Sequence, residues 1–586
     1  MDESITRQQE AMKTTTSTRC VGRLLAGGLA VGSALMLAAC GGGSSPGSIG
    51  QAAPATATAA KALVATAAVS TEDDADGRSF RTVPKASCGE EDNPETALQG
   101  QVPAALRASG FGGFSCNLKL IGQVRGDGAN WQSAEFKDRV HKCAYHGTSY
   151  STVNRTQLGV PVIDVTRADR PTVAGYLTTS SMLDPWESLK VNERRALLGA
   201  NQGNNGGLAG WGGAGVDIYD VSVDCRYPQL LATIDVGLPN GTTGVVPTNA
   251  VVGHEGSWAP DGLTYYGGDL TNRQYYAVDT TIPTEPKLIA TWLPGPNVPP
   301  IPAGGIALIT HGMSISDDGN RGYFVSLATI PTAAELVNPS VLAVNGLLIY
   351  DTSEIQARKA NPRVRLISRL FWKDGGSSQH TINVHIGGKP YIVFVDEGGP
   401  AGNGTAGPAA ACAANLPPYP MARLIDIGDE TRPRIVSRLA LEVHDPANCR
   451  ATLPDIVGQT NFTYGSHYCS VDNRQEATTL VCGYFNSGIR VFDIRNPRRP
   501  KEVAYYNPAG TTTPSPGSNH IGVSGAVNSV NNWVAGGPDW CSAQAHLDAK
   551  EGVLWTTCQD NGLLVLKFEN GVWPFPTSRT PPGEQN

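Results

Sequence analysis

Histidines recur at matching places in this chain and are the residues best suited to do chemistry. Five of its ten histidines stand just before the first strand expected in a repeated unit: His254, His311, His380, His467 and His546. If those strands surround one axis, the imidazoles would line its mouth and could bind Cu, Zn, Fe or Ni. The same placement suits anion binding, proton transfer near neutral pH, or a purely structural hydrogen bond between neighbouring strands.

Further polar residues could join such a site. His141 or His146 could supply the matching imidazole of the first unit, whereas His385 and His444 fall outside the pattern. Acidic and amide side chains end the second strands expected in the repeats, namely Asp269, Asp396, Glu397, Asn486 and Asp560. Turn formation is the simpler role for these five residues.

A short phrase that ends in or near Asp recurs along the chain and defines the repeated unit. Its copies lie at 162–165, 218–221, 276–279, 348–351, 424–427 and 491–494, and each precedes a segment that begins with Pro. The Asp is expected to accept N–H bonds from the turn after its strand. Asp-Gly-like turns and period-two alternation inside the units predict antiparallel hairpins.

These units predict an all-β fold, a seven-bladed β-propeller with four-stranded antiparallel blades. Residues 552–568 form a seventh unit that lacks a Pro-led fourth strand, and residues 117–122 look like a lone fourth strand near the start of the chain. Pairing the two would close the ring with an N-terminal strand and remove two exposed sheet edges. An open solenoid is the alternative, and it leaves residues 117–122 unexplained.

The Leu/Val-Ile-Asp-Val phrase with its following Pro resembles the repeat of the LVIVD-repeat proteins, a bacterial group of predicted β-propellers. The resemblance covers residues 116–568 and implies the fold rather than an activity. The second unit departs most from the pattern, because it has no entry His and carries a Gly- and Asn-rich loop at 201–215. We expect this loop and the insertion at 398–420 to form rims over one face.

The N-terminus has the features of a bacterial lipoprotein signal. Arg19 and Arg23 precede a short apolar run that ends in Leu37-Ala38-Ala39-Cys40, which resembles a lipobox. The resemblance implies cleavage before Cys40 and acylation of its thiol and new N-terminus by palmitate or similar chains. Gly41 after the Cys implies the outer membrane, with the protein facing either the periplasm or the cell surface. An ordinary signal peptide with a chance Cys is the alternative.

These features divide the chain into four parts. Residues 1–39 are the predicted lipoprotein signal peptide, and residues 40–85 are a flexible tether rich in Gly, Ser, Ala and Pro. Residues 86–575 form the predicted β-propeller, and residues 576–586 form a disordered tail. The tether would let the propeller stand away from the membrane.

Ten cysteines beyond Cys40 predict disulfides in an oxidising compartment, since their number is even. They are Cys88, Cys116, Cys143, Cys225, Cys412, Cys449, Cys469, Cys482, Cys541 and Cys558. The sequence does not fix their connectivity, and pairing of sequence neighbours is the simplest guess. His141 and His467 each stand two residues before a Cys, on one strand face, so metal ligation by such pairs is the lesser alternative.

Composition excludes several classes of function. A net charge of −7 and the lack of any Lys/Arg-rich block argue against a nucleic-acid partner. The sequence contains no Gly-x-Ser-x-Gly elbow, Walker loop, dinucleotide fingerprint, His-Glu-x-x-His or Cys-x-x-Cys-His motif. The catalytic residues are therefore unknown, and no organic cofactor is indicated.

Two functions fit these observations. The first is an outer-membrane lipoprotein that acts as a binding or interaction module, with a membrane contact through its anchor and an unidentified protein or small-molecule ligand. The alternative is a metal-dependent oxidoreductase, hydrolase or lyase. Its transition metal would be held at the channel mouth by the five recurring histidines.

Replacing Cys40 by Ser tests the anchor. The variant lacks the thiol that would be acylated, and at least two acyl chains are needed to hold a protein stably on a bilayer. Cys40→Ser is expected to move the protein from sedimented membranes to the soluble fraction, as followed by immunoblotting. Unchanged sedimentation would refute lipidation.

Overall fold

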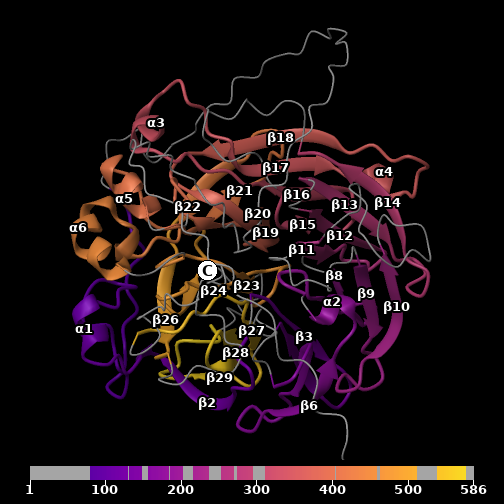
Figure 1. The fold of residues 1–586 in the computed structure, drawn as a ribbon, viewed down its shortest axis with the longest axis horizontal. Helices are drawn as coiled ribbons and strands as arrows, with labels where there is room; N and C mark the ends of the chain where they lie inside the picture. The colour runs from indigo at the N-terminus through magenta and orange to yellow at the C-terminus, as the bar shows by residue number, and fades with distance from the viewer. Residues whose placement is uncertain are drawn as a thin grey trace, which may run out of the picture. The chain divides into compact units, whose positions relative to one another are not determined.

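Seven small antiparallel sheets form a ring in the computed structural model, which confirms the predicted seven-bladed β-propeller (Figure 1). The structure describes residues 80–129, 131–147, 156–183, 185–201, 215–235, 253–269, 273–294, 310–402, 404, 406–457, 462–510 and 537–575. The predicted signal peptide, Cys40, most of the tether, the loop at 202–214 and the C-terminal tail lie outside these residues. No described helix has the length and hydropathy that crossing a membrane requires.

The first three blades follow the chain in order. Blade one consists of β3 (Ser133–Lys137), β4 (Lys142–His146), β5 (Val160–Asp164) and β6 (Thr172–Leu177). Blade two consists of β7 (Lys190–Asn192), β8 (Leu197–Asn201), β9 (Gly215–Asp220) and β10 (Gln229–Asp235). Blade three consists of β11 (Glu255–Trp258), β12 (Thr264–Asp269), β13 (Gln274–Asp279) and β14 (Lys287–Trp292).

The remaining blades continue the ring, and the last two take up strands from the start of the chain. Blade four consists of β15 (Met313–Ile315), β16 (Arg321–Ser326), β17 (Asn345–Asp351) and β18 (Arg365–Trp372). Blade five consists of β19 (Gly376–Ile386), β20 (Lys389–Gly398), β21 (Ala422–Asp426) and β22 (Arg434–Arg438). Blade six consists of β23 (Cys469–Val471), β24 (Thr479–Gly483), β25 (Ile489–Asp493), β26 (Lys501–Asn507) and β1 (Phe114–Cys116). Blade seven consists of β27 (His546–Asp548), β28 (Val553–Cys558), β29 (Gly562–Phe568) and β2 (Leu118–Val124).

Among the described residues, short helices lie in the connections between strands, except for α1, which precedes the first strand. The α-helices are α1 (Ala104–Ala108), α2 (Ser180–Leu183), α3 (Ala333–Val337), α4 (Ser353–Gln356), α5 (Ala406–Ala413) and α6 (Cys449–Thr452). The 3-10 helices are η1 (Glu442–His444), η2 (Pro446–Asn448) and η3 (Leu453–Ile456). In Figure 1 the first strands, such as β11, β15, β19 and β23, lie toward the centre of the ring, whereas β18 and β10 lie at its periphery. Residues just before or within the first strands are therefore the ones that can meet at the axis.

The ring closes where the sequence predicted it. β2 pairs antiparallel with β29, with Leu120 opposite Leu566, so the N-terminal segment supplies the fourth strand of blade seven. β1, which we did not predict, adds a fifth strand to blade six by pairing with β26. Asn117 joins the two strands at a φ of 58°, a left-handed conformation that Asn tolerates better than most residues. One short stretch of chain thus fastens two neighbouring blades.

Residues before β1 also pack on the ring. Val83 is buried and its N–H donates to the carbonyl of Ala440 at 2.8 Å. Arg490 is fully buried and forms ion pairs with Glu95 and with Glu502. The packed part of the chain therefore includes Val83, which lies within the segment that the composition marked as tether, because this single apolar side chain inserts among the residues of blades five and six.

The repeated Asp residues have the role that the sequence predicted. Each accepts the N–H of the residue two positions later, in the turn that follows the third strand. The acceptors are Asp164, Asp220, Asp279, Asp351, Asp426 and Asp493. The phrase thus encodes a strand end rather than a site.

Disulfides join sequence neighbours, as predicted. The pairs are Cys88–Cys116, Cys143–Cys225, Cys412–Cys449, Cys469–Cys482 and Cys541–Cys558. The bonds at 469–482 and 541–558 each join neighbouring elements of one blade, and the bond at 143–225 links blades one and two. Because Cys143 and Cys469 are committed to disulfides, the alternative of metal ligation by His–Cys pairs is wrong.

Truncation of Leu566 tests the closure. Leu566 is fully buried opposite Leu120, so Leu566→Ala is expected to cost about 2–5 kcal/mol of stability. The neighbouring Lys567→Ala is the control, because Lys567 is exposed on the same strand and its loss should cost about 0.5 kcal/mol or less. Urea titration followed by tryptophan fluorescence measures both. Equal midpoints for the two variants would contradict closure by this strand pair.

Candidate metal centre

Three of the five recurring histidines meet at the axis. His254 directly precedes β11, and His311 and His467 each stand two residues before the first strands of blades four and six. All three side chains are buried, with at most 1% of their surface exposed. Placement just before a first strand therefore brings these imidazoles inside the ring.

Glu187 is the residue around which they gather. It lies between α2 and β7 in blade two, and its side chain is fully buried. Its Oε2 is 3.3 Å from Nε2 of His254 and 3.3 Å from Nε2 of His311, and its Oε1 is 3.2 Å from Nε2 of His467. One carboxylate thus contacts imidazoles from three blades.

Glu397 supplies a second buried carboxylate. It stands near the end of β20, the second strand of blade five, and is fully buried. Its Oε2 is 3.1 Å from Nε2 of His467, and its Oε1 is 3.8 Å from Nε2 of His311. Glu187 and Glu397 therefore flank the imidazoles of His311 and His467. Two overlapping sets of side chains each place their ligand atoms within 4.8 Å of one another: Glu187 with His254 and His311, and Glu187 with Glu397 and His467.

Backbone carbonyl groups hold the rings of His311 and His467 through their Nδ1 atoms. Nδ1 of His311 lies 2.9 Å from the carbonyl oxygen of Gln379, and Nδ1 of His467 lies 2.9 Å from that of Ser542. Because a carbonyl oxygen can only accept, each Nδ1 carries the hydrogen. In the neutral ring Nε2 then presents a lone pair to the carboxylates, the arrangement usual for a histidine that binds a metal.

The electrostatics of the cluster call for positive charge between the imidazoles and the carboxylates. Burial opposes the charge on His467, but hydrogen bonds to Glu187 and Glu397 raise its pKa to about 10. Burial also lowers the pKa of His311. His254 lies 3.3 Å from Glu187, yet its buried Nε2 makes no hydrogen bond of acceptable geometry to any described residue. This nitrogen therefore faces the Glu187 carboxylate at contact distance without a well-aligned hydrogen bond.

Aromatic side chains cover one side of the cluster. A buried group consists of Trp131, Trp186, Phe462, Phe485 and Trp540. The ring of Trp131 is 5.2 Å from that of His467, and the ring of Trp186 is 6.0 Å from that of His254. An apolar wall of this kind lowers the local dielectric and strengthens charge interactions at the centre.

His380 lies beside the centre rather than in it. It falls inside β19, after a bulge between Ser378 and His380, so Gln379 takes the axial place. Nε2 of Gln379 donates to Oε2 of Glu187 at 3.1 Å, and its carbonyl holds His311. His380 instead stacks on Tyr468 with ring centroids 4.7 Å apart.

His546 also lies apart from the three central histidines. It begins β27, and its ring stacks on Trp555 at 4.2 Å while its Nε2 lies 3.1 Å from the hydroxyl of Ser133. In blade seven, the group that reaches the centre is the carbonyl of Ser542, which lies four residues before His546 and contacts Nδ1 of His467. The equivalence that we predicted among five histidines therefore holds for three.

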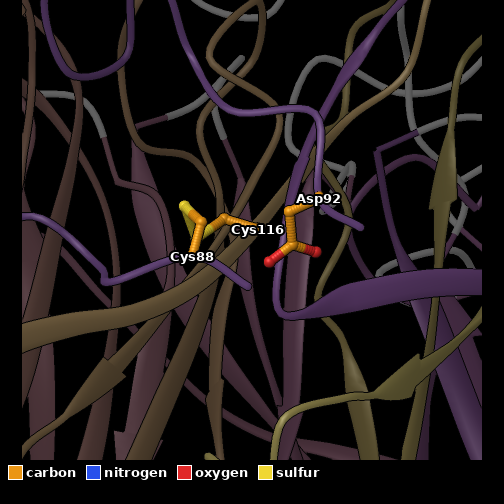
Figure 2. A group of neighbouring side chains, drawn as sticks. All are labelled: Cys88, Asp92 and Cys116. Carbon is orange, nitrogen blue, oxygen red and sulfur yellow. A yellow bond between two sulfur atoms is a disulfide. The ribbon is translucent and has the colours of Figure 1, made fainter. Parts of the chain in front are cut away.

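Two other groups of possible ligands are committed to other contacts. Figure 2 shows that Cys88 and Cys116 are bonded to each other beside Asp92, so their sulfur atoms are not available to a metal. In the second group, Asp138 accepts the N–H groups of His141 and Cys225, and Asp224 pairs with Arg226. We interpret both groups as structural.

The remaining candidates have structural contacts. Asp396 forms an ion pair with Arg423 and accepts a hydrogen bond from Trp372. Asn486 accepts a hydrogen bond from Trp540, and Asp560 forms an ion pair with Arg125. Asp269 accepts from Gln274 at 3.4 Å. His146 ends the second strand of blade one, and burial lowers its pKa to about 4. Of the five strand-end residues that we named, Glu397 alone reaches the cluster among the described contacts.

Glu187 is the residue that sequence analysis missed. It stands in blade two, which departs most from the repeat, and nothing in the Asp phrase marks it. A weak signal did separate the histidines: His254, His311 and His467 are each followed three residues later by Ser, whereas the corresponding residues after His380 and His546 are Asn383 and Ala549. This three-residue spacing between His and Ser could have identified the three histidines that meet at the axis.

Comparison with known proteins gives only distant likenesses. No family model matches the chain, and no curated protein matches it. A solved structure named as a putative 6-phosphogluconolactonase from Bacteroides uniformis is 12% identical, covers 74% of this chain and 94% of its own, and has a TM-score of 0.43. Another of that name from Bacteroides fragilis is 10% identical, covers 73% and 93%, and has a TM-score of 0.40.

Removing the charge of Glu135, beside His546, gives a pH-dependent prediction. Burial raises the pKa of Glu135 to about 7, above its usual 4.5, even though Trp555 donates a hydrogen bond to the carboxylate. The raised pKa contributes stability below pH 4.5 that is lost as the pH rises through 7. Relative to wild type, Glu135→Gln should therefore gain about 3 kcal/mol between pH 4 and pH 8. Urea midpoints at the two pH values measure this, and a constant difference would contradict it.

Proposed function

We propose that this chain binds one divalent first-row transition metal at the axis of its propeller and uses it in a metal-dependent reaction. The ligands are Glu187, His254, His311, Glu397 and His467. The observation that carries the proposal is the convergence of three buried Nε2 atoms on one buried carboxylate, at 3.2–3.3 Å.

The spacing of the donor atoms suits a shared ion. Charge-assisted hydrogen bonds between nitrogen and oxygen are usually about 2.7–2.9 Å long, shorter than the distances found here. Adjacent ligands that each lie about 2.1 Å from one ion stand roughly 3.0 Å apart at right angles. The contacts of Glu187 with the histidines lie nearer to this second value.

Charge balance favours the same conclusion. Two buried carboxylates carry two negative charges when ionised, and an uncompensated buried charge costs several kcal/mol. A divalent ion would neutralise both and would also coordinate Nε2 of His254, which faces Glu187 without a well-aligned hydrogen bond. The donor set of three nitrogens and two carboxylates, without sulfur, suits Fe, Mn, Zn or Cu.

The ion would supply the chemistry that the rest of the molecule positions. The five protein groups would hold the ion, which would act as a Lewis acid on an exogenous molecule or, with an external electron acceptor, in a redox reaction. Gln379 would hold Glu187 in position, and the carbonyls behind His311 and His467 would orient their rings. The reaction class is accordingly an oxidoreductase, or a hydrolase or lyase.

Location at the outer membrane belongs to the same proposal. The lipobox residues before Cys40 support it, and five disulfides among the described residues fit an oxidising compartment outside the cytoplasm. Membership of the LVIVD-repeat proteins is supported by the recurring phrase. A role as a binding module for a protein partner remains a prediction from the sequence.

Metal analysis of the purified protein tests the proposal. We expect about one equivalent of a transition metal in wild type by inductively coupled plasma mass spectrometry, and loss of most of it in Glu187→Gln, since loss of one ligand should weaken binding at least as much as the 10–100-fold known for second-shell changes. His311→Ala combined with His467→Ala should be metal-free.

His380→Ala and His546→Ala are the matched controls. Both remove a histidine of the predicted set of five, buried His380 or partly buried His546, but neither side chain is among the contacts of Glu187 that the structure describes. They should keep the wild-type metal content. A metal-free wild type whose double variant only unfolds at lower temperature would mean that the imidazoles are structural.

A further inference from the structure

A second feature of the axis is a cavity of about 630 Å³. Its walls include Lys190 of blade two, Ser257 and Trp258 of blade three, and Val471 and Arg474 at the end of β23 and just beyond it in blade six. Because blades two and six are not neighbours, their first strands approach one another only across the axis. A cavity of this size is within the range of small-molecule sites.

The cavity lies at the end of the first strands opposite to the metal centre. In blade three, His254 precedes β11, whereas Ser257 and Trp258 end it. In blade six, His467 precedes β23, whereas Val471 ends it. One short strand therefore separates the candidate ligands from the cavity wall in each blade.

The side chain of Tyr468 stands between them. Its ring is 4.9 Å from that of His467, on the side of the metal centre, and Nζ of Lys190, a cavity residue, lies 4.8 Å from its centroid. Its hydroxyl donates to Glu255 and lies 3.3 Å from the carbonyl oxygen of Glu187. The phenol thus contacts the surroundings of the centre on one side and the cavity lining on the other.

Hydrogen bonds hold the backbone of Tyr468 in place. Movement of its side chain is therefore what would open a path between the cavity and the centre. Its N–H donates to Ser542 at 3.1 Å, and its carbonyl accepts from Gly483 at 2.9 Å. The disulfide of Cys469 with Cys482 ties the next residue to the neighbouring strand. Rotation of the buried ring would break its stacking on His380 and its hydrogen bond to Glu255, but would leave this backbone frame in place.

From this arrangement we infer that the axial cavity is the chamber through which the metal ion and small exogenous ligands reach the centre, with the phenol of Tyr468 as its inner gate. The inference rests on the proposed metal centre. On the opposite side, the aromatic group around Trp131 and Trp540 packs against the rings of His467 and His254. The route therefore runs from the ends of the first strands toward their beginnings.

Uptake of Co²⁺ by the metal-free protein tests the route, because the d–d absorption of the bound ion reports binding without any assay of activity. Tyr468→Ala should raise the rate of uptake about tenfold or more, whereas Tyr468→Phe, which keeps the ring, should change it far less. Ser257→Trp should fill part of the chamber and slow uptake by a similar factor.

Two controls separate the route from general loosening. Trp540→Leu trims the aromatic side and should leave the rate unchanged, and Ser222→Trp adds the same bulk at an exposed site. The rate of azide binding to the Co²⁺-loaded protein should rank the variants in the same order as the rate of Co²⁺ uptake. Circular dichroism checks that each variant is folded, and Tyr468→Leu replaces Tyr468→Ala if the latter fails to fold.

The outcomes distinguish the two proposals. Faster uptake in Trp540→Leu with no change in the Tyr468 and Ser257 variants would place the entrance on the aromatic side. Equal rates in all variants, with Co²⁺ still bound, would refute the route alone. Failure of the wild type to bind Co²⁺ would refute the metal centre and the route with it.

Discussion

Two carboxylates buried at the axis need positive charge around them, and the rest of the centre depends on meeting that need. Removing a carboxylate from water costs several kcal/mol unless it is paired. Glu187 and Glu397 are fully buried, and the groups described against them include imidazoles and the amide of Gln379. Hydrogen bonds to both carboxylates raise the pKa of His467 to about 10, against the effect of its burial. A divalent ion would meet the same need and would also bind Nε2 of His254, which faces Glu187.

Closure of the propeller ring brings the carboxylates and the imidazoles of the centre together. The polar groups of the centre come from five consecutive blades, from Glu187 in blade two to His467 in blade six. Blades two and six are brought face to face because β2 joins β29 and β1 extends blade six. Segments at the start of the chain thus support a centre made of residues far along it.

Much of the fold was predictable from the sequence because it is repeated. The Asp phrase marks the third strand of six blades, and residues 117–122 identified the closing strand. Pairing of sequence neighbours gave all five disulfides, since blades are local units. The site was only partly predictable, because a bulge in β19 shifts His380 off the axis and brings Gln379 onto it. Glu187 lies in the one blade where the repeat is weakest, so no periodicity pointed to it.

The two ends of the axis have different chemistry. Five aromatic side chains pack toward one end, where a low dielectric strengthens charge pairs. Toward the other end, Tyr468, Glu255 and Lys190 lead to a cavity lined by charged, polar and apolar residues. This asymmetry gives a buried centre both a dry wall and a polar approach, which are the two properties that metal chemistry on a small molecule requires.

Anomalous diffraction from crystals at metal absorption edges tests the central claim most directly. The account predicts a single peak on the axis, about 2.1 Å from Nε2 of His254, His311 and His467 and from oxygens of Glu187 and Glu397. Such crystals with no peak there, or with the ion bound instead at the Asp138 cluster on blade one, would contradict it.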